Sequence, residues 1–175
     1  HSKLIRMLED LNDYTLDIEE VLDKHFNREN LTYWLAFNIL TGNVDTQSRN
    51  VYLYSPQNMD IWYLLPWDLD SFLSLQENQT QGRMEYGGSV RGVSNYWGNV
   101  LFQRCLKSSA FREELDAAIL DLKEYLSPSR IRGLADQYRA VTEPYLSRQP
   151  DIGHAVLTAK EYDQIADGLP ELVEL

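Results

Sequence analysis

The 175-residue chain has little cysteine, little positive charge and no long apolar run. Its single cysteine, Cys105, excludes an internal disulfide bond and any zinc site built from several cysteines. Lys and Arg number 16 against 27 Asp and Glu, a net charge of −11, so the chain lacks the basic surface that binds nucleic acid. No apolar run approaches the roughly 20 residues of a membrane-spanning helix. We therefore expect no nucleic-acid partner and no membrane span in this segment.

What the chain does have is helical periodicity in its first part. Apolar residues recur at helical spacing over residues 4–11, and Thr15 is a candidate cap for a second short helix that extends through Leu22. A third helix is expected from about residue 30 to residue 40, because its apolar stripe ends just before Gly42.

The chain beyond residue 95 is also predicted to be mainly helical. The expected helices cover residues 96–106, a segment capped by Ser109 and running to Leu126, a segment starting at Ser127-Pro128, and a last segment capped by Thr158 and interrupted by Gly168 and Pro170. Cys105 lies among apolar neighbours in the first of these, so we expect a small buried core residue rather than a reactive thiol. The polar, glycine-rich residues 71–95 predict a long irregular segment.

Residues 50–65 change from a helical to an alternating pattern. Two alternating runs, residues 50–54 and 61–65, surround the turn-rich residues 55–60, which predicts a β-hairpin closed by Pro66. The aromatic residues here are expected to belong to the core rather than to form a stacking surface for adenine. They are Tyr52, Tyr54, Trp62 and Trp67. The predicted fold class is mainly α with one small antiparallel β-hairpin (α+β).

Three polar residues follow one another in an order that is typical of phosphoryl transfer. Asp45 lies in the loop after the third helix, Asn50 opens the hairpin five positions later, and Asp68 follows the hairpin. Protein kinases use this order and spacing: the first Asp accepts the proton of the substrate hydroxyl, and the Asn and the later Asp bind magnesium, which prefers hard oxygen ligands. The His-Arg that usually precedes the first Asp is absent, and Asp68-Leu69-Asp70 stands in place of Asp-Phe-Gly.

Residues 43–54, NVDTQSRNVYLY, and residues 62–72, WYLLPWDLDSF, extend this pattern. Together they resemble the signature of the CotH (spore-coat-H-type) family of atypical protein kinases, over roughly residues 27–72. The resemblance implies a protein-kinase-like C-terminal lobe that transfers the γ-phosphate of ATP to serine on partner proteins, with Mg²⁺ or Mn²⁺. It implies Asp45 as catalytic base, and Asn50 and Asp68 as metal ligands that hold the cofactor. It also implies a coat or surface protein as substrate, and a spore-surface or exported location.

Asp70 is a candidate further metal ligand. In an extended segment its carboxylate would point to the same side as that of Asp68, and such a pair is costly unless a cation neutralises it. The alternative is a loop Asp bound to nearby backbone N–H groups. Two other functions also stay open: a non-catalytic kinase-like scaffold that binds a surface or coat protein, and a carboxylate-metal hydrolase that uses Asp45, Asp68 and Asp70 without a nucleotide.

The chain shows little sign of the lobe with which a kinase grips ATP. That lobe contains a glycine-rich strand pair over the phosphates and a lysine that pairs with them. Before Asp45 the chain has only Lys3 and Lys24, both in predicted helices, and no predicted strand pair. We therefore expect residues 1–175 to be a single domain, the C-lobe portion of a CotH-type kinase without its N-terminal lobe, and inactive or nearly so by itself.

Overall fold

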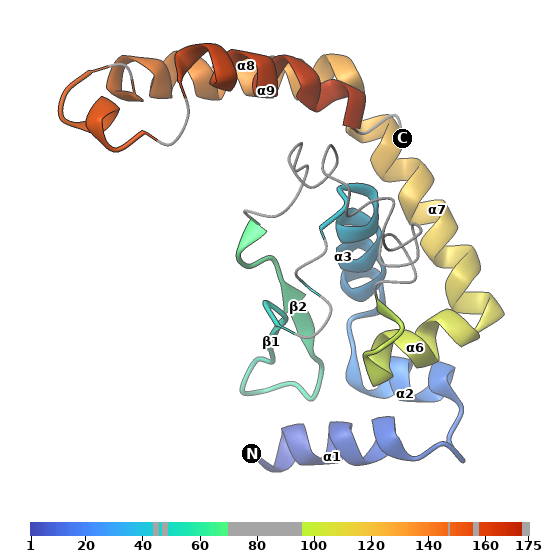
Figure 1. Cartoon of the computed structure of the whole chain (residues 1–175). Helices are drawn as coiled ribbons and strands as arrows, with labels where there is room; N and C mark the ends of the chain where they lie inside the picture. Colours follow the sequence, from blue (N-terminus) through green and yellow to red (C-terminus); the bar gives the residue numbers. More distant parts are fainter. Residues whose placement is uncertain (44–45, 47–48, 70–95, 147, 156–157, 173–175) are drawn as a thin grey trace.

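A computed structural model describes residues 1–43, 46, 49–69, 96–146, 148–155 and 158–172. Within these residues seven α-helices and a short 3-10 helix accompany one pair of strands, which confirms the predicted α+β fold (Figure 1). The elements are α1 (Ser2–Asn12), α2 (Ile18–His25), α3 (Arg28–Leu40), β1 (Tyr52–Tyr54), β2 (Tyr63–Leu65), α6 (Val100–Lys107), α7 (Ser109–Tyr125), α8 (Pro128–Leu146), η3 (Asp151–Gly153) and α9 (Ala159–Leu172).

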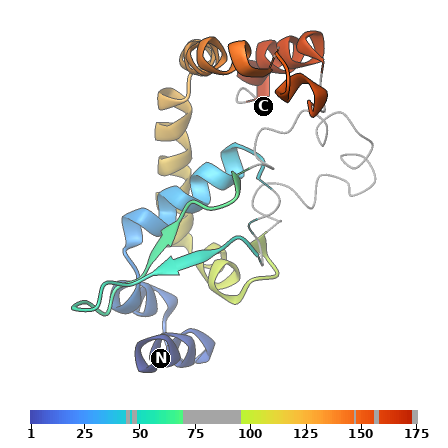
Figure 2. The same cartoon turned by 90° about the vertical axis from the view of Figure 1, so that its left-hand side faces the viewer.

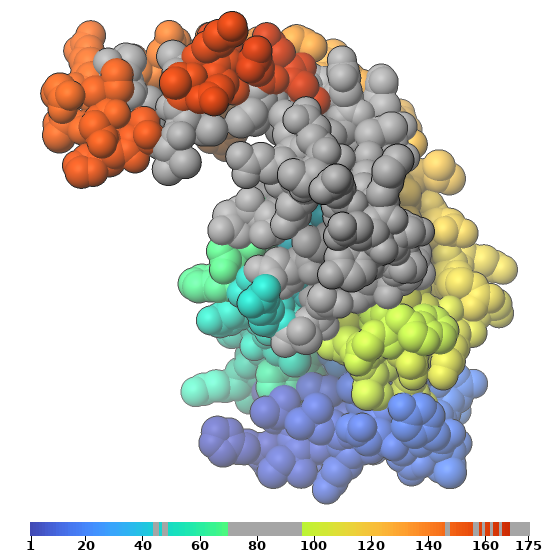
Figure 3. All heavy atoms as spheres, viewed as in Figure 1, coloured from blue at the N-terminus to red at the C-terminus, as the bar shows by residue number. Residues whose placement is uncertain are grey.

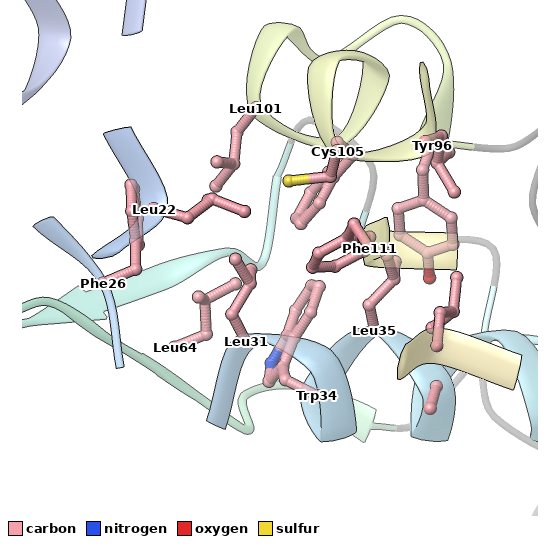
Figure 4. Close-up of a cluster of buried hydrophobic side chains, with 14 of the residues drawn as sticks. Leu22, Phe26, Leu31, Trp34, Leu35, Leu64, Tyr96, Leu101, Cys105 and Phe111 are labelled. Atoms are coloured by element: carbon pink, nitrogen blue, oxygen red, sulfur yellow. The ribbon is translucent and has the colours of Figure 1, made fainter. Parts of the chain in front are cut away.

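The core lies around α3, which packs along α7 and is covered by α6 and the hairpin (Figures 1 and 4). Its centre is aromatic: the rings of Trp34 and Phe102 are stacked with centroids 5.5 Å apart, and Tyr96 meets Phe102 edge-on at 5.3 Å. Phe111 and Leu35 are fully buried beside them. Such pairs add about 0.5–1.5 kcal/mol each to the gain from burying apolar area, so this cluster fixes how α3 sits against α6 and α7.

Polar side chains of α3 attach the hairpin to this core. The side chain of Asn30 accepts a hydrogen bond from the Leu64 backbone N–H at 2.7 Å and donates one to the Leu64 carbonyl at 3.2 Å. The indole N–H of Trp34 donates to the carbonyl of Leu65 at 3.3 Å. Because α3 satisfies the outer backbone groups of β2, the position of the short hairpin follows from the position of α3.

The first helix is held by a buried arginine from the other half of the chain. The guanidinium of Arg104 donates to the carbonyls of Leu11 and Leu16, both at 2.6 Å, and to those of Asp10 and Asp13 at 3.3 and 3.2 Å. These carbonyls lie at the end of α1 and in the turn after it, where helical partners are lacking. Arg104 therefore fixes the end of α1 on α6.

α1 also contacts α2, through the buried side chain of His25. Its Nε2 lies 2.6 Å from the carboxylate of Asp10, and the ammonium of Lys24 lies 2.6 Å from the same carboxylate oxygen. These hydrogen bonds, that of Lys24 first, lower the pKa of Asp10 below its ordinary value. The backbone carbonyl of His25 accepts from the N–H of Trp62 at 2.7 Å, so the end of α2 also meets the hairpin.

Several predicted helix starts are wrong by a few residues, each because a neighbouring side chain makes the cap. Asp17, not Thr15, caps α2 by accepting from the Glu19 N–H at 3.0 Å, while Thr15 donates to Asp13. α3 starts at Arg28, two residues before the expected start, because Asn27 caps it by accepting from the N–H of Asn30. The later helices show the same kind of shift.

In the second half of the chain Tyr96 precedes a helix that starts only at Val100, because Asn99 accepts from the N–H of Leu101 at 3.0 Å. Ser108, not Ser109, caps α7. The expected Thr158 cap is confirmed, since Thr158 and Glu161 exchange hydrogen bonds at the start of α9. The predicted interruption is wrong: α9 continues through residues 168 and 170 to Leu172.

The C-terminal helices α8 and α9 form an arm that extends from the end of α7, away from the rest of the fold (Figures 1 and 2). Ion pairs join the two helices: Arg139 lies 2.5 Å from Asp163, and Arg132 lies 3.9 Å from Asp167. We call α8, η3 and α9 the arm, and the elements from α1 to α7 the body.

Cys105 is fully buried in the body, as predicted, and burial raises the pKa of its thiol. Among the helices of the described residues, none has the length and apolar character that crossing a membrane requires.

Candidate functional site

The hairpin brings Asn50 and Asp68 to the same end. β1 and β2 pair antiparallel, and Tyr52 opposite Leu65 is the pair farthest from the turn. Asn50 lies two residues before Tyr52, and Asp68 lies three residues after Leu65, so both stand just beyond the open end of the ladder. Asn50 is half-buried and Asp68 is exposed.

Both residues have a left-handed backbone conformation. The φ angle is 57° at Asn50 and 52° at Asp68, and no other non-glycine residue in the described part of the chain has a positive φ. Asn and Asp tolerate this region better than most L-residues, but it still costs about 1–2 kcal/mol and concentrates at functional sites. The chain therefore turns sharply at both candidate ligands, at one end of one hairpin.

A buried polar network lies beneath the loop that leads to Asn50. The Asn43 amide donates to the Asn38 side-chain oxygen at 2.8 Å, and the Thr46 hydroxyl lies 3.4 Å from the same oxygen. The hydroxyl of Tyr96 lies 2.9 Å from that of Thr46 and donates to the carbonyl of Asn43 at 3.2 Å. All four residues are almost completely buried, so the residues on either side of positions 44 and 45 are fixed by satisfied hydrogen bonds in a low-dielectric environment.

Local sequence explains how the network forms. Asn38 lies in α3, where its amide donates to the carbonyl of Trp34 at 2.7 Å and leaves its oxygen free to accept. Gly42 follows with φ 64°, a left-handed position that suits glycine, and the N–H of Asn43 returns to the carbonyl of Asn38 at 2.9 Å. Tyr96 comes from the other side of the core, with its hydroxyl directed toward α3 (Figure 4).

The aromatic residues near the site differ from the prediction. Tyr52, Tyr54 and Trp67 are about half exposed rather than in the core. The rings of Tyr52 and Trp67 contact each other at the open end of the hairpin, with centroids 4.6 Å apart and planes tilted by 33°. The three-residue strands give the hairpin one covered face, so side chains of the other face point away from α3. Trp62 does pack against the core, with its indole nitrogen buried and without a hydrogen-bond partner.

Two of the four predicted site residues, Asp45 and Asp70, lie outside the described residues. Asn50 and Asp68 lie at one hairpin end, and their amide and carboxylate oxygens are the hard donors that Mg²⁺ or Mn²⁺ would take. Within the described part of the chain, no three His, Cys, Asp or Glu side chains gather to hold a metal ion. The donor chemistry of the two described residues thus fits a hard cation that needs further ligands.

Sequence reasoning missed the residues that support the loop. Asn38 occupies a core position of α3, and a polar side chain at such a position of an apolar helix stripe is the signal that marks it. Thr46 lies inside the motif of residues 43–54, where no local pattern distinguishes it. Tyr96 had no local signal, because its partners are some fifty residues earlier in the chain.

The fold and the position of Asn50 and Asp68 indicate the class of protein. The described residues form a mainly helical domain with a hairpin that carries an Asn before it and an Asp after it, which is the layout of the larger lobe of a protein kinase. The chain belongs to the CotH family, because the family model described as CotH kinase protein matches residues 1–174. This match confirms the resemblance, extends it beyond residues 27–72 to nearly the whole chain, and indicates a kinase-like function. No curated protein and no solved structure matches the chain.

Proposed function

We propose that this chain is the catalytic-loop half of an ATP-dependent protein kinase that phosphorylates serine on a partner protein, with a coat or surface protein as the expected substrate. The observation that carries the proposal is the left-handed backbone of Asn50 and Asp68 at the open end of the hairpin. These two residues are the metal ligands that the kinase template selects from the sequence, and strained backbone concentrates where side chains must be aimed.

Asp45 is the proposed catalytic base. Its carboxylate accepts the proton of the serine hydroxyl as the serine oxygen forms a bond to the γ-phosphorus of ATP and the bond to the bridging oxygen breaks, leaving ADP. The network of Asn38, Asn43, Thr46 and Tyr96 supports this role, because it fixes residues 43 and 46 on both sides of that position. Its hydrogen bonds would limit the loss of catalytic geometry through loop motion.

Asn50 and Asp68 are the proposed ligands of Mg²⁺ or Mn²⁺, with Asp70 as a further ligand. The cation would neutralise charge on the phosphates. We also propose that residues 1–175 act together with an N-terminal lobe that grips ATP. Without it the chain is expected to bind metal weakly and nucleotide poorly, because most phosphate contacts would be lost.

The test is incorporation of labelled γ-phosphate from ATP into protein by the longer parent protein, with Mg²⁺ or Mn²⁺. Asp45→Asn and Asp68→Ala should each reduce transfer by about 100-fold or more, the range typical for loss of a general base or of charge stabilisation. Asp60→Asn is the matched control, since Asp60 is an exposed carboxylate near the hairpin turn, at the opposite end from the site.

Wild-type rates in both site variants would contradict the residue roles. A folded parent that neither transfers phosphate nor binds ATP with metal would favour the non-catalytic scaffold that binds a surface or coat protein. Cleavage of an ester or glycoside without ATP, lost in the same variants, would instead favour the carboxylate-metal hydrolase.

A further inference from the structure

The arm carries an exposed apolar stripe along α8. Leu134, Tyr138, Val141 and Tyr145 are 40%, 69%, 67% and 67% exposed, respectively. Their spacing of four, three and four residues places them on one face of the helix. The four side chains together expose on the order of 400–500 Å², about as much as the largest apolar patch of a typical monomer, and such patches mark interaction sites.

The ion pairs that join α8 to α9 come from a different face of α8 than this stripe. The residues of α8 that pair with α9 are Arg132 and Arg139, seven positions apart, and they lie on a different side of the helix. The arm stands out from the body, and in Figure 3 it forms a ridge that continues past the body's edge. A partner can therefore reach the stripe without displacing α9.

The charges of α8 restrict what that partner is. Its charged residues at positions 132, 136, 139 and 143 are off the stripe, and the neighbours Gln137 and Thr142 are uncharged. Arg130 borders the stripe one turn before Leu134, where its guanidinium lies over the Tyr125 ring. A basic or acidic partner would need opposite charges here, and none lies on the stripe between Leu134 and Tyr145. Two copies of a chain with net charge −11 repel at long range, so they meet most readily through a surface without acidic side chains, as this stripe is.

The spacing of the stripe is also symmetric. Read in either direction it is four, three, four, so a second copy in antiparallel orientation places Tyr138 opposite Val141 and Tyr145 opposite Leu134. Each large ring then faces a smaller aliphatic side chain, as packing between two helices requires. A two-fold axis between the copies produces this arrangement without further adjustment.

We propose that α8 is a self-association surface through which two copies of this chain pair antiparallel about the Tyr138–Val141 stripe. The pair would bury on the order of 800–1,000 Å² in total, less than the roughly 1,200–2,000 Å² of stable complexes, so the association is weak and seen at high protein concentration. The proposal does not depend on the proposed phosphoryl transfer.

Sedimentation equilibrium of the 175-residue chain tests it. The weight-average mass should rise from 20.4 kDa toward twice that value as the concentration increases to about 1 mM. Val141→Asp and Tyr138→Lys should each raise the dissociation constant at least about tenfold, because each places a charge against an apolar side chain of the other copy. Leu120→Asp on α7, equally exposed and off the stripe, is the control and should keep the wild-type constant.

A mixture of the two variants gives the sharpest result. In an antiparallel pair the new Asp at position 141 of one copy faces the new Lys at position 138 of the other, while the second Tyr–Val contact is unchanged, so association should return. A wild-type mass of 20.4 kDa at every concentration would overturn the proposal, as would equal weakening by Leu120→Asp or a mixture that stays monomeric. Far-UV circular dichroism checks that each variant keeps its helices.

Discussion

The body and the arm differ in how much of their apolar surface is buried. In the body α3 is enclosed, so Leu31, Leu35 and Ala36 have no exposed surface, and polar groups near them find partners. In the arm α8 packs against α9 and the short η3, and much of its apolar surface stays exposed. The stability of the fold and the candidate site therefore both belong to the body, while the arm contributes surface for contact.

The largest loss of stability is expected from a substitution that removes a buried hydrogen-bond donor from the body. We expect Arg104→Met to lower the free energy of unfolding by about 3 kcal/mol, because it removes the donor of the buried Leu11 carbonyl and of the partly buried Leu16 carbonyl. Urea denaturation measures this change. The control in the arm is Arg130→Met, which removes an exposed guanidinium 3.7 Å from the Tyr125 ring centre and should cost less than about 1 kcal/mol. Equal losses would mean that the two regions are held in similar ways.

The network beneath the loop should give the next largest effect. Asn38→Leu keeps the branched shape of the side chain but removes the acceptor of Asn43 and Thr46, and should cost about 2 kcal/mol of unfolding free energy. Tyr96→Phe, which removes one hydroxyl, should cost about 1 kcal/mol. Thermal or urea unfolding gives both values, and Asn58→Leu in the exposed hairpin turn is the control. A stable Asn38→Leu variant would show that the network does not hold the loop.

The arm should open more easily than the body. Arg139→Met removes the ion pair with Asp163, which joins α8 to α9, and should cost at most about 1 kcal/mol because both groups are partly exposed. Hydrogen exchange measured by mass spectrometry should be faster in α8 and α9 of this variant and unchanged in α3. Faster exchange in α3 would show that the arm and the body unfold as one unit.

The smallest expected effect is a pH dependence at Asp10. Its pKa is lowered from the ordinary 3.8 by the hydrogen bonds from Lys24 and then His25, so its contribution to stability is present above that value and is lost as the pH falls through the lower folded pKa. The melting temperature of Asp10→Asn should be below that of the wild type at pH 6. The two should converge at the acid end, and Lys24→Gln should reproduce part of the difference. A constant difference at all pH values would contradict the assignment.

Local patterns in the sequence predicted the features that depend on neighbouring residues. The hairpin follows from alternation around a turn, and Asn50 and Asp68 follow from their order about it. Long-range contacts escaped prediction, because the partner of Thr46 is Tyr96, on a different element fifty positions away. The exposed aromatics also escaped, since alternation shows that a strand has two faces but does not show which one the body covers.

The solitary buried thiol of Cys105 makes this chain convenient for site-specific labelling. Reagents that attack surface thiolates do not reach it, since it is fully buried and its pKa is raised. Any cysteine introduced on the surface would therefore be modified alone, without first replacing the native one. Two such positions, one on α1 and one on α9, would allow a dye pair to follow the angle between the arm and the body by energy transfer in single molecules.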